Sequence, residues 1–109
     1  MRLTEAEVSA IVNSIEEFIE PNFAGTLMLF GSRTDDTKVG GDIDLALIVI
    51  SNEWADKFKK IDFKIVAAIK MKNEIGDQKI DFKILNRTDA QKSFFVEALK
   101  NAILIKNWD

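Results

Sequence analysis

Two aspartates and a glycine-serine pair are the residues of this chain whose types and spacing could support chemistry. Asp42 and Asp44 flank one isoleucine at the start of an apolar run, and Gly31-Ser32 precedes them with nine intervening residues. If the run is a β-strand, both carboxylates point to the same face and can hold one divalent cation or bridge two. Backbone N–H groups and the hydroxyl of a glycine-serine turn can bind phosphate oxygens. The pattern therefore predicts a magnesium-nucleotide site.

A third carboxylate depends on how one repeated segment folds. The hexapeptide Lys-Ile-Asp-Phe-Lys-Ile occurs at residues 60–65 and again at 79–84. The first copy continues a helical spacing of apolar residues, whereas the second follows a Gly-Asp turn. Because flanking context overrides identical local sequence, we expect a helix for the first copy and a strand for the second. Asp81 then faces the same side of the sheet as the first two aspartates, and Asp62 is a solvated helix residue.

The composition restricts the chemistry that is possible. The chain contains no cysteine, histidine or tyrosine, which excludes disulfides, thiol nucleophiles, zinc sites and histidine-based acid–base catalysis. Catalysis must therefore use carboxylates, hydroxyls, lysine or arginine, and a hard metal ion. The net charge of -3 argues against nucleic acid as the main partner, because binding to a phosphate backbone requires a basic surface.

The length and hydropathy predict one small domain over residues 1–109, with a single core. No apolar stretch approaches membrane-spanning length, and the acidic, polar start at Met1–Ala10 is unlike a signal peptide. We therefore expect a cytoplasmic protein without a membrane partner.

The spacing of apolar residues predicts an α/β fold. Capping boxes at Thr4–Glu7 and Thr88–Gln91 precede helical spacings, and runs of apolar residues indicate buried strands. Residues 103–105 could be helix or edge strand. We expect a small mixed sheet, helices mainly on one face and an open cleft on the other. In order, the expected elements are a helix that ends at Pro21, strands Thr26–Phe30 and Ile43–Ile50, a helix from Trp54 to about Lys72, a strand Lys79–Leu85, and a helix with an inner face of Phe95, Ala98, Leu99 and Ala102. Trp54, Phe58, Phe95 and Leu99 are the expected core aromatic and aliphatic residues.

These motifs resemble a known family. Phe30-Gly31-Ser32-Arg33, then Asp42-Ile43-Asp44-Leu45-Ala46, then a later strand aspartate resemble the signature of the nucleotidyltransferase superfamily related to DNA polymerase beta. The chain is most similar to the minimal nucleotidyltransferases, small bacterial proteins often paired with a HEPN-domain toxin. The resemblance spans essentially the whole chain and implies a polymerase beta-like nucleotidyltransferase fold. Thr34–Thr37 and Gly41 depart from the family pattern, but neither departure removes a metal ligand.

The resemblance also implies roles for individual residues. Gly31-Ser32 would hold the terminal phosphates of the nucleotide, and Arg33 would either contact phosphate or form a surface ion pair. Asp42 and Asp44 would bind magnesium, while Asp81 would bind a second ion and help to deprotonate the attacking hydroxyl. Two such ions lie about 3.5–4 Å apart and stabilise both oxygens of an in-line displacement.

Three functions remain open at this point. The first is an enzyme that transfers a nucleoside monophosphate, AMP from ATP, to a hydroxyl of a HEPN-type protein partner and thereby acts as an antitoxin. The second is a non-catalytic antitoxin that masks its partner, and the third is an aminoglycoside-type adenylyltransferase. Three carboxylates favour an enzyme, and the small size favours a protein partner. Phe63 and Ile103–Trp108 are candidate docking residues, while the acceptor, the base preference and the homo- or hetero-oligomeric state remain open.

Overall fold

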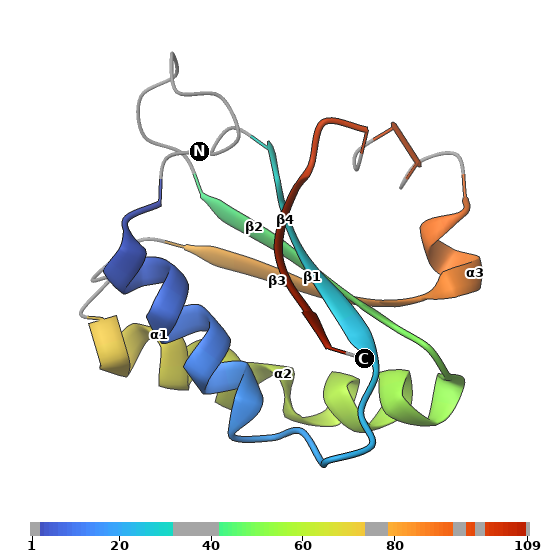
Figure 1. Ribbon diagram of the computed structural model, residues 1–109, viewed down its shortest axis with the longest axis horizontal. Helices are drawn as coiled ribbons and strands as arrows, with labels where there is room; N and C mark the ends of the chain where they lie inside the picture. Colours follow the sequence, from blue (N-terminus) through green and yellow to red (C-terminus); the bar gives the residue numbers. More distant parts are fainter. Residues whose placement is uncertain (1–2, 32–41, 74–78, 93–95, 98–99, 109) are drawn as a thin grey trace.

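Four strands form one mixed sheet in the computed structural model, which describes residues 3–31, 42–73, 79–92, 96–97 and 100–108 (Figure 1). The strand order is β3-β2-β1-β4, with β2 and β3 parallel and the other two pairs antiparallel. The elements are α1 (Glu5–Glu16), β1 (Gly25–Phe30), β2 (Ile43–Val49), α2 (Asn52–Asn73), β3 (Ile80–Asn86), α3 (Arg87–Ala90) and β4 (Ile103–Trp108). The expected α/β class and mixed sheet are confirmed.

The two long helices cover one face of the sheet. Helices α1 and α2 pack against each other, and α2 also contacts β2 and β3 (Figure 1). Alternate side chains of β2 are completely buried beneath them, because successive side chains of a strand point to opposite faces. These buried residues are Ile43, Leu45, Leu47 and Val49. Their neighbours on the strand, Asp44 among them, consequently lie on the face turned away from the two helices.

Helix α1 begins as predicted but ends earlier. The Thr4 hydroxyl accepts from the Glu7 N–H and the Glu7 carboxylate accepts from the Thr4 N–H, so the capping box is present. The prediction that Pro21 ends this helix was wrong, since it ends at Glu16. The N–H of Phe18 donates to the Ile15 carbonyl, which tightens the chain into a turn before the proline is reached.

An aromatic cluster joins the segment before β1 to α2 and to the C-terminal strand. The buried Phe23 ring makes edge contacts with Trp54, Phe58 and Trp108 at centroid distances of 5.1, 5.4 and 5.8 Å. Phe58 is fully buried as expected, whereas Trp54 is only half-buried at the edge of the core. None of the described helices is long and apolar enough to cross a membrane.

The segment after β3 differs from the prediction. The capping box is formed by Asn86 and Asp89 and not by Thr88 and Gln91, and α3 spans only Arg87–Ala90. Strand β3 holds Asn86 in an extended conformation, which is the backbone state of an N-cap residue. Residues 103–108 form edge strand β4, which settles the open alternative. Phe95, Ala98 and Leu99 lie outside the described residues, and Ala102 is half-buried before β4.

Candidate functional site

The pairing of three strands places an aromatic side chain and two carboxylates in one row. Asp44 of β2 lies opposite Asp81 of β3 in the parallel pair and opposite Phe30 of β1 in the antiparallel pair. All three side chains are half-buried on the sheet face that α1 and α2 leave uncovered. The two copies of the repeated hexapeptide fold as predicted, because residue 62 lies in α2 and residue 81 in β3.

Burial and neighbouring negative charges raise the pKa of the Asp44 carboxyl group. Burial is the largest cause of the raised pKa of Asp44, followed by the negative charges of Asp81 and Asp42. Lys83 and Lys79 act in the opposite direction without cancelling the effect. Asp42 is exposed immediately before β2 and lies within electrostatic range of Asp44. In the protein alone, the protonated form of the Asp44 carboxyl group is therefore favoured more than in a free aspartate side chain.

Gly31 is required by its backbone conformation and by the position of Asp44. Its φ of 79° lies in the left-handed region that glycine adopts readily. A Cβ atom at this position would collide with the Asp44 carboxylate, whose Cγ would be only 3.1 Å away. The sequence predicted that Gly31-Ser32 holds phosphates, and the structure adds that Gly31 allows the Asp44 carboxylate to lie against the turn. Ser32 and Arg33 lie outside the described residues.

Lys83 is a site residue that sequence reasoning missed. Its Nζ lies 3.4 Å from Oδ1 of Asp81, and its charge lowers the pKa of Asp44. A lysine in an alternating strand is usually solvent-facing, so its type gave no signal. The spacing could have revealed it, because residues two apart on a strand share a face and Lys83 follows Asp81 by two.

The donor atoms fit a magnesium ion that is held jointly with a nucleotide. No group of three or more metal-binding side chains that could enclose an ion occurs among the residues described in the structure. Magnesium usually binds one or two carboxylates, with waters and substrate phosphates completing its octahedral shell. Asp44 and Asp81, side by side on neighbouring strands, match that requirement. The assignment of Asp42, Asp44 and Asp81 as ligands stays a prediction.

Comparison with known proteins adds an independent finding. A family model described as Polymerase beta, Nucleotidyltransferase matches residues 13–109, from within α1 to the last residue. No curated protein gives a significant match. The matched segment contains the glycine-serine pair and all three aspartates. It covers most of the chain and agrees with the mixed sheet and its helices, and the family supports nucleotidyl transfer as the general activity. The chain therefore belongs to the polymerase beta nucleotidyltransferase family.

Proposed function

We propose that this protein is a magnesium-dependent minimal nucleotidyltransferase that transfers AMP from ATP to a hydroxyl group of a protein partner. The observation that carries the proposal is the pairing of Asp44 with Asp81 across parallel strands, where burial and like charge raise the pKa of Asp44. Two carboxylates held in this way are a site that a divalent cation would stabilise. The family supplies the reaction class.

The three aspartates and Lys83 would have different roles in the reaction. Asp44 and Asp81 would hold magnesium, with Asp42 as a further ligand at the exposed edge. Magnesium bound there would neutralise phosphate charge while the acceptor hydroxyl oxygen displaces pyrophosphate from the α-phosphate of ATP. Asp81 would also accept the proton of the attacking hydroxyl, because it lies beside the site on the open face of the sheet. The Lys83 ammonium holds the Asp81 carboxylate in place by their ion pair.

Phosphate binding is assigned to the turn after β1. Gly31 is exposed, and its left-handed backbone conformation matches a turn whose N–H groups can face an anion. Ser32 would add a hydroxyl and Arg33 a charged donor, in keeping with the family pattern. A triphosphate bound there would lie next to the Asp44 carboxylate, since that side chain contacts Gly31.

The acceptor is proposed to be a HEPN-type toxin, with this chain as its antitoxin. The support is the resemblance to minimal nucleotidyltransferases and the absence of tyrosine from this chain, which removes one kind of hydroxyl for self-modification. A site made of carboxylates and a phosphate-binding turn provides little selection among acceptors. A docked protein would supply that selection by positioning its own hydroxyl.

The proposal can be tested with ATP labelled at the α-phosphate, magnesium and a purified HEPN-type partner. We expect label on the partner, and intact-mass measurement should show one or more added AMP groups there and none on this chain. Asp81→Asn should abolish the transfer, while Asp62→Asn, the same residue in the other copy of the hexapeptide, should preserve it. Binding without transfer would indicate a masking antitoxin. Transfer to an aminoglycoside alcohol without partner would indicate an antibiotic-modifying enzyme.

A further inference from the structure

An apolar stripe lies on the outer face of α2. Phe63, Ala67 and Met71 follow one another at four-residue spacing, which places them along one side of a helix. All three are exposed, Phe63 to 65% and Met71 to 81%. An amphipathic helix of a globular protein normally carries polar residues on its outer face. Packing within the fold therefore does not explain why these positions are apolar.

The opposite side of α2 already supplies the helix's contribution to the core. Its buried residues are Ala55, Phe58, Ile65 and Ile69. The outer stripe consequently points away from the sheet and from the row that contains Asp44 and Asp81. The other large apolar residues exposed in the described part of the chain, Ile50, Val96 and Leu104, come from three separate segments. Among the residues that the structure describes, α2 is the only helix with two exposed large apolar side chains on one face.

Lysines flank the outer stripe on both sides. Lys60 and Lys64 lie along one flank and Lys70 along the other, as their helical positions require. None of these three forms an ion pair with a residue that the structure describes. By contrast, Lys57 and Lys72 are paired with glutamates at Nζ–Oε1 distances of 2.7 and 2.6 Å. The outer stripe is thus apolar along its length and positively charged at its borders.

We propose that the outer stripe is a docking surface for an amphipathic helix of a partner protein that carries acidic residues beside its apolar ones. Helix docking of this kind uses apolar anchors at three- and four-residue spacing, and the lysines would select acidic flanks. A second copy of this chain would oppose lysines to lysines if it docked through the same face.

Strand β4, the other docking candidate from the sequence, uses part of its surface within the fold. Ile105 and Trp108 pack against the core, and Trp108 Nε1 donates to Glu16 of α1 at 2.9 Å. The docking proposal specifies the surface chemistry of the protein partner named under the proposed function. It rests on the existence of that partner and not on the catalytic assignment. Because the outer stripe and the carboxylates lie on opposite sides of the sheet, docking and nucleotidyl transfer can fail separately.

The probe is a fluorescein-labelled synthetic amphipathic helix with leucines at i, i+4 and i+7 and glutamates beside them, mixed with the full chain. Fluorescence anisotropy should show saturable binding, and the same peptide with lysines in place of glutamates should not bind. Phe63→Ser/Met71→Ser should weaken binding at least about tenfold, as expected for central anchors. Lys60→Glu/Lys64→Glu should weaken the acidic peptide and allow the basic one to bind.

Leu104→Ser is the matched control, because Leu104 is also exposed, to 57%, but lies on β4. It should leave peptide binding unchanged, and circular dichroism should show that each variant is folded. Asp81→Asn should keep peptide binding while losing AMP transfer, which separates this proposal from the catalytic one. The docking proposal is overturned if neither peptide binds or if Leu104→Ser weakens binding as much as the double variant. Dimer formation in sedimentation, or binding to phosphatidylserine vesicles, that depends on Phe63 and Met71 would also overturn it.

Discussion

Asp44 lies opposite Asp81 on the open face of the sheet and has a raised pKa. Its pKa is raised from 3.8 by burial, then by Asp81 and Asp42. Between 3.8 and the raised value, the native state binds more protons than the unfolded state, so the free energy of unfolding falls as pH rises through that window. Above the window the ionised carboxylate destabilises the metal-free protein by a constant amount.

Asp44→Asn should remove this effect. We expect the metal-free variant to be at least as stable as the wild type at pH 7 and to lose the decline of stability just above pH 3.8. Urea unfolding over a series of pH values checks this. AMP transfer by the same variant should fall by orders of magnitude. A variant less stable than wild type at neutral pH would show that the carboxylate is stabilised by its surroundings, contrary to the raised pKa.

Lys83→Met should change the binding of magnesium and of nucleotide in opposite directions. Removal of the ammonium beside Asp81 makes the carboxylate row more negative, so magnesium alone should bind more tightly and the triphosphate more weakly. Because the Lys83–Asp81 pair is partly exposed, each change should be modest, about two- to fivefold. Calorimetric titrations with magnesium alone and with ATP measure both. Lys60→Met, on the outer face of α2, should change neither affinity.

Helices and strands were predicted correctly where the apolar pattern of a segment agreed with the residues that flank it. Strands β1, β2 and β3 were predicted within a residue or two, because their apolar runs lie between turn residues. The two hexapeptides were separated correctly by their flanking residues. The short helix α3 was misplaced because Asn86–Asp89 and Thr88–Gln91 both resemble capping boxes, and only the end of β3 decides between them.

The repeated hexapeptide permits a comparison of one residue type in two elements. Asp81→Ala should reduce turnover by orders of magnitude, because it removes a proposed metal ligand and proton acceptor. Asp62→Ala should change turnover little, since Asp62 lies on a helix flank away from the carboxylate row. Single-turnover AMP transfer under identical magnesium concentrations compares them. Reversed effects would mean that the site has been assigned to the wrong copy.

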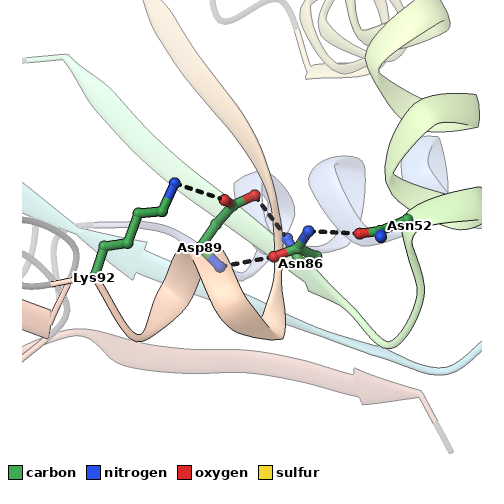
Figure 2. Close-up of polar contacts among 4 residues, drawn as sticks. All are labelled: Asn52, Asn86, Asp89 and Lys92. Atoms are coloured by element: carbon green, nitrogen blue, oxygen red, sulfur yellow. Dashed lines mark hydrogen bonds and ion pairs between the residues drawn. The ribbon is translucent and has the colours of Figure 1, made fainter.

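Asn86 connects three elements through its side chain (Figure 2). Its Oδ1 accepts from the Asp89 N–H at 2.7 Å, and its Nδ2 donates to Asn52 at the start of α2 at 2.6 Å. Asn86→Ala should therefore lower the free energy of unfolding by about 1 kcal/mol, the usual cost of losing an N-cap. Thr88→Ala should cost much less, because Thr88 is not the cap. A larger loss for Thr88→Ala in urea unfolding would contradict the observed capping box.

For the whole molecule, the pattern of residues indicated the parts of the site but not how they meet. Asp44 and Asp81 are far apart in sequence, and only the parallel register of β2 and β3 makes them neighbours. The contact of Asp44 with Gly31 and the ion pair of Lys83 likewise arise from strand pairing. Phe63 was a docking candidate from the sequence alone. The stripe that it forms with Ala67 and Met71 could be recognised only when the buried side of α2 was known.

The two faces of the molecule should respond separately to nucleotide. A ligand that binds only the native state stabilises it by about 2.7 kcal/mol at a concentration one hundred times its Kd, which raises the Tm of a small domain by several degrees. Magnesium with a non-hydrolysable ATP analogue should therefore raise the Tm of the wild type, and Asp44→Asn should lose most of this shift. Phe63→Ser/Met71→Ser should retain it, because the outer stripe lies across the sheet from the carboxylates. Scanning calorimetry of the wild type and the two variants measures these Tm shifts. An equal shift in Asp44→Asn would refute the proposed nucleotide site, whereas loss of the shift in the stripe variant would show that the two faces are coupled.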